Sequence, residues 1–126
     1  MKILGIDYGR KKIGLAVSEG ILSEPWKVIR VGDFEGAVGK ILQILKELKA
    51  DKVIVGVSEG KMGEESRKFA KRVGAETFDE TLSTHNAQEL SREARVGRKK
   101  RKDFEDAYAA AVMLQSYLEQ TLCLKM

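Results

Sequence analysis

Short apolar runs alternate with polar turns over the first part of the chain. Residues 2–8 and 12–19 are mostly apolar and are separated by a turn at 9–11, which is typical of two strands joined by a tight connection. A third strand is expected at 21–30, where Pro25 favours an edge or broken strand because proline cannot donate a ladder hydrogen bond. The pattern therefore predicts an antiparallel meander.

Helices alternate with strands over the rest of the chain. Asp33 can cap a helix, and the almost wholly apolar run at 52–57 is typical of a buried parallel strand. The other expected elements are a loop at 58–63, a helix at 64–73, a strand near 75–79, a helix at 83–94 and a final helix at 103–121.

The first and last of these helices each show one apolar face at helical spacing. The face of the first comprises Ala37, Val38, Ile41, Leu42, Leu45 and Leu48, and that of the last comprises Ala107, Ala110, Ala111, Leu114, Tyr117 and Leu118. With 126 residues, the chain is expected to form one domain over 1–126. We predict an α/β fold whose mixed sheet begins antiparallel, continues with parallel strands and is flanked by helices.

The composition of the chain is that of a globular protein without membrane spans or internal disulfides. Hydrophobic residues make up 43% and charged residues 33% of the chain, as in a globular protein. No apolar run approaches the length of a membrane span, and the chain begins on a predicted strand without a secretory signal pattern, so we expect a cytoplasmic protein with no membrane partner. The single cysteine, Cys123, excludes an internal disulfide.

Positive charge is concentrated in one segment. Six of the eight residues at 95–102 are Lys or Arg and none is acidic, whereas the formal net charge of the whole chain is only +4. Such a segment indicates contact with a polyanion, although a solvated run of charges is the alternative. We expect a mobile connection here, with the contact made by Arg98, Lys99, Lys100, Arg101 and Lys102.

Carboxylates recur where predicted strands end or where a helix begins. Asp7 closes the first strand, Glu80 follows the last strand, and Asp103 and Asp106 share a face of the final helix because they are three residues apart. Caps and helix-start acids are one explanation. The other is a cation site, and acids without His or Cys partners favour Mg²⁺ or Mn²⁺.

Carboxylates combined with a basic segment suggest a phosphodiester substrate. Metal ions held by such acids can activate a water molecule and stabilise the leaving oxygen. Arg10, Lys11 and Lys12 follow Asp7 on the same turn and could hold a phosphate oxygen, or simply form a solvated turn. Tyr8 and Trp26 could stack on a base, but packing at the sheet edge is the alternative for Trp26.

Three segments together resemble the YqgF/RuvX family. Residues 5–18 match its opening motif, and Asp-Glu-Thr-Leu-Ser-Thr at 79–84 resembles its Asp-Glu-Arg-Leu-Ser/Thr-Thr motif. Residues 106–118 resemble its C-terminal pattern of Asp-x-x-Ala-Ala and Leu-Gln-Ser-Tyr. The segments occur in the order and approximate spacing of the family, so the resemblance extends over essentially the whole chain.

This resemblance implies an RNase H-like fold, related to the RuvC resolvases, and a metal-dependent nuclease. It places the catalytic and metal-binding acids at Asp7, Glu80 and Asp106. Family members are described as nucleases that mature the 5′ end of pre-16S rRNA and as Holliday junction resolvases. The expected partners are therefore RNA or branched DNA, including a ribosomal precursor.

The chain also departs from the family pattern. The loop at 58–63 is shorter and lacks proline, and Thr81 replaces the arginine of the Asp-Glu-Arg motif. Glu59 is an additional acid that could be a metal ligand or a solvent-facing loop residue. Asp103 is likewise either a further ligand or an ordinary acid at a helix start.

Three functions remain open from the sequence. Processing of pre-16S rRNA is the first, and junction resolution is the second. A resolvase cuts two strands symmetrically and needs a dimer, whereas we expect a monomer or a weak homodimer. The third is a non-catalytic nucleic-acid-binding module. The length of the chain argues strongly against a two-lobed ATPase of the actin-like group, because that architecture needs two such lobes and the cleft between them.

Overall fold

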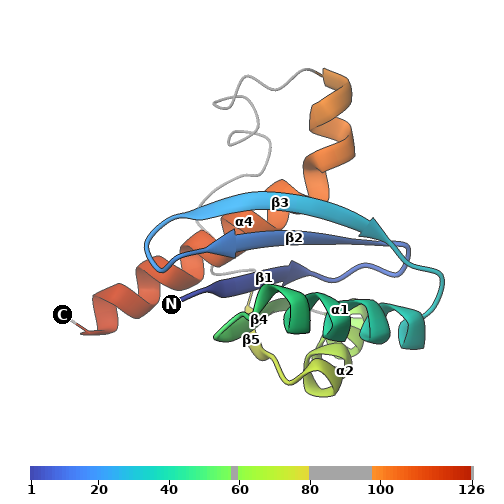
Figure 1. Ribbon diagram of the computed structural model, residues 1–126, viewed down its shortest axis with the longest axis horizontal. Helices are drawn as coiled ribbons and strands as arrows, with labels where there is room; N and C mark the ends of the chain where they lie inside the picture. Colours follow the sequence, from blue (N-terminus) through green and yellow to red (C-terminus); the bar gives the residue numbers. More distant parts are fainter. Residues whose placement is uncertain (58–59, 80–97, 126) are drawn as a thin grey trace.

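A mixed sheet lies at the centre of the computed structural model, which describes residues 1–57, 60–79 and 98–125 (Figure 1). Its five strands lie in the order β3-β2-β1-β4-β5. Neighbouring strands among β1, β2 and β3 are antiparallel, whereas β4 pairs parallel to β1 and β5 pairs parallel to β4. The predicted mixed sheet is confirmed, with bounds of Ile3–Asp7 for β1, Lys12–Ser18 for β2, Ser23–Arg30 for β3, Lys52–Val57 for β4 and Glu76–Asp79 for β5.

Helices cover both faces of the sheet (Figure 1). Helix α1 (Phe34–Leu48) and helix α2 (Lys61–Val73) cover one face, and helix α4 (Arg98–Lys125) crosses the other. The predicted cap of α1 is confirmed, because the Asp33 carboxylate accepts a hydrogen bond of 2.7 Å from the Gly36 amide. The predicted helix at 83–94 lies outside the described residues. None of the helices that the structure describes is long and apolar enough to span a bilayer.

Two element boundaries differ from the sequence prediction. Helix α2 begins at Lys61, so the last three residues of the expected loop at 58–63 are helical. Helix α4 begins at Arg98, so the basic residues Arg98–Lys102 belong to the helix and the expected mobile connection is wrong at these positions. Lys and Arg are good helix formers, and they continue the helix backwards from its apolar part.

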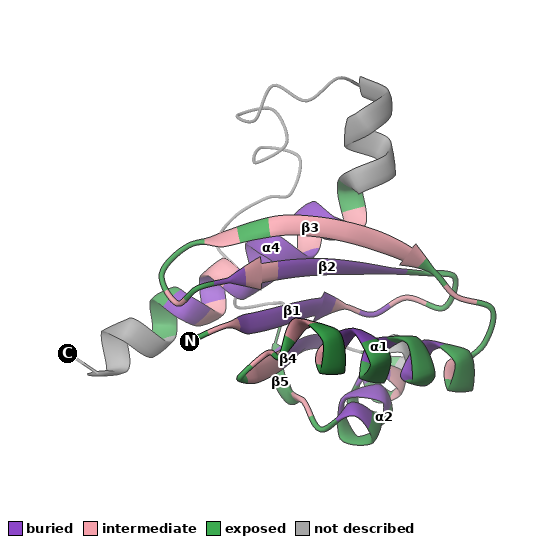
Figure 2. Ribbon diagram, viewed as in Figure 1, coloured by how far each residue is buried: buried purple, intermediate pink, exposed green. Residues whose placement is uncertain are grey.

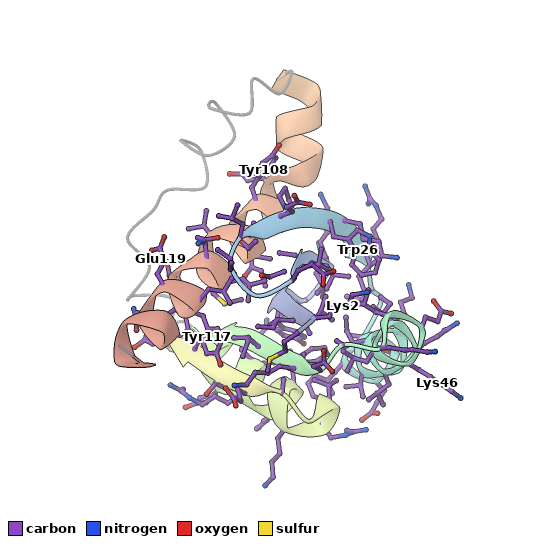
Figure 3. The ribbon with its side chains drawn as sticks, turned by 60° about the vertical axis from the view of Figure 1, so that its left-hand side comes forward. Lys2, Trp26, Lys46, Tyr108, Tyr117 and Glu119 are labelled. Carbon is purple, nitrogen blue, oxygen red and sulfur yellow. The ribbon has the colours of Figure 1, made fainter. Side chains whose placement is uncertain are left out.

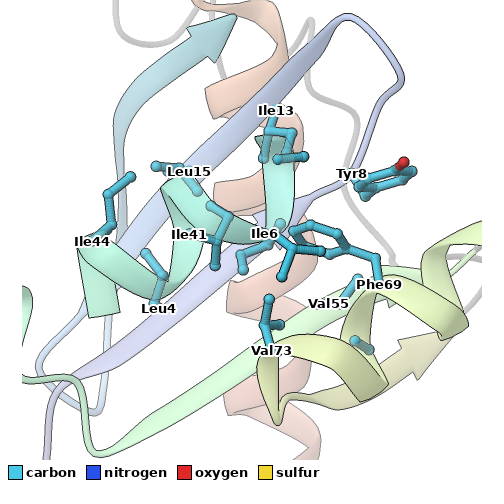
Figure 4. Packing of buried hydrophobic residues seen from close by; sticks show 13 residues of the cluster. Leu4, Ile6, Tyr8, Ile13, Leu15, Ile41, Ile44, Val55, Phe69 and Val73 are labelled. Carbon is cyan, nitrogen blue, oxygen red and sulfur yellow. The ribbon is translucent and has the colours of Figure 1, made fainter. Parts of the chain in front are cut away.

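The strands divide their side chains between two apolar clusters. Leu4 and Ile6 of β1, and Tyr8 just after it, pack against α1 and α2, whereas Ile3 packs against α4. Period-two alternation of side chains along a strand produces this division. Figure 4 shows the first cluster from close by, and Figure 2 shows that β1 and most of β2 are buried.

The predicted apolar face of α1 is wrong at one residue, Leu42. Leu42 is 46% exposed, whereas Ile44 is buried between α1 and the sheet. Ala37, Ile41 and Ile44 follow the spacing of four and three residues that keeps side chains on one face. Leu42 lies a further 100° around the helix from Ile41, which turns it to solvent.

β3 is an edge strand, as Pro25 predicted. Its register with β2 shifts between Leu15 and Ala16, which pair with Lys27 and Pro25. Trp26, which lies between Pro25 and Lys27 on β3, packs partly against the apolar cluster on the α1 side of the sheet. The Lys27 ammonium lies 4.4 Å from the centroid of the Trp26 ring. The packing alternative for Trp26 is therefore confirmed.

Helix α4 approaches the sheet most closely at glycines. A Cβ atom at Gly14 would overlap the carbonyl oxygen of Asp106, and one at Gly5 would lie 3.0 Å from the Cβ of Leu114. Glycine within a strand permits such a close backbone approach. The two glycines therefore determine how near α4 lies to β1 and β2.

Tyr8 connects the end of β1 to α2. Its ring is buried and packs on Phe69, with 4.6 Å between the ring centroids. Its hydroxyl donates a hydrogen bond of 3.0 Å to a carboxylate oxygen of Glu65. Burial, followed by this hydrogen bond, raises the pKa of Tyr8 to about 12. The buried ring is not available to stack on a base.

Gly14→Ala tests the close approach of α4. We expect a loss of about 1–3 kcal/mol in the free energy of unfolding, because the new methyl group forces α4 away from β2. Gly39→Ala is the control: Gly39 lies in α1 with open space around it, and alanine there should stabilise by about 0.5–1 kcal/mol. Urea denaturation measures both. Equal stability of parent and Gly14→Ala would contradict the packing argument.

The raised pKa of Tyr8 predicts a stability change at high pH. An unfolded tyrosine ionises near pH 10, whereas Tyr8 in the folded protein ionises near pH 12. Its contribution to stability is therefore full below pH 10 and is lost as the pH rises to about 12. Denaturation of parent and Tyr8→Phe at pH 8–12 isolates this effect, since the variant lacks the ionisable group. Parallel pH profiles would refute it.

Candidate active site

Asp7 occupies the carboxyl end of the central strand. It is partly buried, and it follows Ile3 and Gly5 at alternate positions along β1. Ile3 packs in the cluster beneath α4, and Gly5 faces Leu114 of α4. Since alternate residues share a face of a strand, Asp7 lies on the α4 side of the sheet.

Asp106 lies beside this strand end through the packing of α4. Its carbonyl oxygen sits against Gly14, and Gly14 is the cross-strand partner of Asp7. Directly opposite residues of antiparallel strands have Cα atoms about 4.5–5.5 Å apart. Ala110, one turn later in α4, is fully buried against the sheet, so Asp106 shares the sheet-facing side of the helix. The fold thus brings together two partly buried acids that are distant in sequence.

The structure describes the other predicted ligands, and the acid Asp79 that precedes Glu80, less completely. Glu80 and Glu59 lie outside the described residues. Asp103 lies in α4 one turn before Asp106, but its side chain is not among those described. Asp79 is exposed and adjoins Phe78, which packs beneath α4, so alternation places Asp79 on the opposite face. Within 1–57, 60–79 and 98–125, no group of three His, Cys, Asp or Glu residues is close enough to hold a metal ion.

Arg10 is held by a carboxylate that sequence analysis did not identify. Its Nε donates to Glu65 Oε2 at 2.8 Å, and the other oxygen of the same carboxylate accepts from Tyr8. The hydrogen bond from Arg10 is the largest cause of the lowered pKa of Glu65, and the same bond raises the pKa of Arg10. Arg10 remains 66% exposed, so its terminal nitrogens can meet a ligand at the surface.

The other predicted basic residues occupy two places. The side chains of Lys11 and Lys12 are exposed at the beginning of β2, and the Lys11 carbonyl accepts a hydrogen bond of 2.9 Å from Val31. Arg98, Lys99, Lys100, Arg101 and Lys102 lie in the first turns of α4, where the structure does not describe side chains.

An open hollow of about 450 Å³ lies near the same end of β1, but on the opposite face of the sheet, between the β1–β2 turn and helices α1 and α2. It is lined by Arg10, Phe34, Glu64, Glu65 and Lys68, which come from the β1–β2 turn, α1 and α2. Its charges are mixed, and it faces away from Asp7 and Asp106. The hollow is therefore separate from the pair of acids.

Two structural roles were not identified from the sequence. Gly14 permits the contact that carries Asp106 to Asp7, and its signal was present, because a glycine inside an apolar strand suggests a close backbone approach. Glu65 orients Arg10 and Tyr8 from a position 57 residues after Tyr8. No local pattern connects these residues, so only the fold identifies Glu65.

Comparison with known proteins finds relatives along nearly the whole chain. The family model described as "RuvX: Holliday junction resolvase" matches residues 1–120. A protein of Desulforamulus reducens named "Putative pre-16S rRNA nuclease" is 35% identical, and the alignment covers 94% of this chain and 97% of the relative. A protein of Bacillus cereus with the same name is 34% identical, with 95% and 99% covered.

Solved structures share the fold at much lower sequence identity. Thermus thermophilus RuvC in complex with a Holliday junction substrate superimposes with a TM-score of 0.62 at 16% identity, covering 96% of each chain. The fowlpox virus Holliday junction resolvase gives a TM-score of 0.60 at 12% identity, covering 96% of this chain and 99% of that one. These neighbours confirm the predicted RNase H-like fold. From the family match and the curated relatives, the chain belongs to the RuvX (YqgF) family.

Proposed function

We propose that this protein is a metal-dependent nuclease that hydrolyses phosphodiester bonds in nucleic acid. The observation that carries the proposal is the meeting of Asp7 and Asp106 at one strand end, on either side of Gly14. Two carboxylates at the surface end of a central strand are suited to bind a cation, because carboxylate oxygens are the ligands that Mg²⁺ and Mn²⁺ prefer. The relatives named as nucleases support the same reaction.

Asp7 and Asp106 would hold Mg²⁺ or Mn²⁺, with Glu80 as the third predicted ligand. Oxygen ligands fit these hard cations, and the described pair offers only oxygen donors. A divalent cation bound there supplies an activated water and offsets the charge that develops on the phosphate. The close approach of α4 to β2 would position the two carboxylates, and the exposed Arg10, Lys11 and Lys12 would bind phosphate oxygens.

For the substrate we propose the 5′ end of pre-16S rRNA. Relatives covering nearly the full length of this chain are named "Putative pre-16S rRNA nuclease", and the resemblance of the sequence motifs to the family suggests the 5′ end. The basic turns Arg98–Lys102 of α4 would bind the flanking backbone, which makes affinity dependent on salt. A ribosomal precursor as substrate places the reaction in the cytoplasm.

Junction resolution is the second candidate, favoured by the description of the matching family. Resolution requires two active sites placed symmetrically, and therefore a dimer. Sedimentation of the purified protein, with and without a four-way DNA junction, tests this requirement. We expect a monomer or weak dimer that cuts the RNA precursor and leaves the junction intact; symmetric junction cleavage by a stable dimer would reverse the order of the two candidates.

Substitution of the two acids tests the active site. We expect Asp7→Asn and Asp106→Asn each to reduce cleavage of labelled precursor RNA in Mg²⁺ by at least about a hundredfold, because an amide is a weak ligand. Glu24→Gln is the control, since Glu24 is an exposed acid near the start of β3, at the opposite end of the sheet. Normal cleavage by Asp7→Asn would refute the assignment and favour a non-catalytic binding module.

Metal binding can be measured without activity. A ligand that binds only the folded state raises the melting temperature. We expect Mn²⁺ or Mg²⁺ to raise the melting temperature of the parent and of Glu24→Gln, but not that of Asp7→Asn. An equal rise in all three proteins would place the cation elsewhere.

A further inference from the structure

Two cations face each other at the end of the β2–β3 ladder. Lys12 and Arg30 are directly opposite each other in the antiparallel register, and both are exposed. Like charges at directly opposite positions destabilise a sheet. Of the ion pairs among described residues, none involves Lys12 or Arg30. Among the side chains that the structure describes, the two like charges therefore lie opposite each other with no carboxylate paired to either.

Neighbouring groups hold this pair in place. The amide of Val31 donates to the Lys11 carbonyl at 2.9 Å, which closes the ladder just beyond the pair. The Lys40 ammonium of α1 donates to the Arg30 carbonyl at 2.6 Å and brings a third cation to the same corner. The acid nearest in sequence to Arg30, Asp33, accepts a hydrogen bond from Gly36 as the cap of α1. The corner is thus positively charged and ordered by backbone contacts.

The pair lies on the same face of the sheet as the acids. Lys12 is two residues before Gly14 on β2, so the two share the α4 face. Arg30 is opposite Lys12, as Val28 is opposite Gly14, and therefore shares that face as well. Two residues along a strand span about 7 Å. Long side chains starting there can reach a phosphate next to the one that a cation would hold at Asp7 and Asp106.

We propose that Lys12 and Arg30 together bind one phosphate group of the substrate backbone, adjacent to the scissile linkage. A phosphate between them would replace their repulsion by two attractive contacts, and the fork of the guanidinium suits its oxygens. This deepens the proposed function and rests on it for the position of the scissile bond. Arg30 becomes a substrate-binding residue, and the lysine-arginine pair becomes one site.

The test measures binding and stability in parallel. Every protein in this test carries Asp7→Asn, which prevents cleavage during the measurement. Binding of a labelled single-stranded RNA is titrated at several salt concentrations for Asp7→Asn alone and for the same protein with Arg30→Gln or Lys12→Gln added. We expect about tenfold weaker binding for each variant and a salt slope smaller by about 0.7, the value for one phosphate contact on a single strand. The melting temperature should stay the same or rise, since each substitution removes a repulsion.

Two further variants sharpen the result. Lys46→Gln makes the same charge change in the last turn of α1, where the side chain points away from the body of the protein (Figure 3), and should leave binding and slope unchanged. If Lys12 and Arg30 hold one phosphate, the double variant should lose much less than the product of the two single losses. Multiplicative losses would indicate two separate contacts and overturn the single site.

Other outcomes also decide the proposal. Parent-like binding by Arg30→Gln, weaker binding accompanied by a lower melting temperature, or an equal loss in Lys46→Gln would each overturn it. RNA binding can be measured without cleavage. The experiment therefore distinguishes a failure of the proposed nuclease function from a failure of the proposed Lys12–Arg30 phosphate site. A parent that binds RNA through this pair but never cuts it would contradict the nuclease and leave the pair intact; a parent that cuts RNA while Arg30→Gln binds normally would contradict only the pair.

Discussion

The contact between the backbone of α4 and the bare backbone of Gly14 supports the whole candidate site. Asp106 is brought to the end of β1 by this contact, because Gly14 is the cross-strand neighbour of Asp7. A second close approach, of Leu114 to Gly5 of β1, keeps α4 close to the sheet about two turns further along the helix. Any side chain at Gly14 would lift α4 and separate the two acids, so the steric constraint and the chemistry share one position.

Alternation along β1 divides structural and chemical roles between consecutive residues. Asp7 faces α4, whereas Tyr8 faces α2 and is anchored there by Phe69 and Glu65. The anchor holds the strand end from the opposite side of the sheet, while Asp7 lies at the surface. Positioning on rigid elements with a hydrogen-bonded support is the arrangement that a catalytic carboxylate requires.

The basic residues near the end of β1 fall into two groups, those paired with a carboxylate and those that face another cation. Arg10 is paired with Glu65, which orients it and compensates part of its charge. Lys12 and Arg30 face each other, and no carboxylate whose side chain the structure describes forms an ion pair with either. In the proposed function, acids at the centre and cations beside them would attract a polyanion and leave its reacting group near the carboxylates. Local repulsion in the free protein is the cost of such a field.

Local patterns determined most of the fold and part of the site. Apolar periodicity placed the strands and helices, Pro25 indicated the edge strand, and family motifs marked Asp7 and Asp106. Periodicity cannot specify contacts between distant segments, since these depend on register and on how closely backbones approach. Only the tertiary structure could therefore join Glu65 to Arg10, set Lys12 opposite Arg30, turn Leu42 to solvent and bring Asp106 against Gly14.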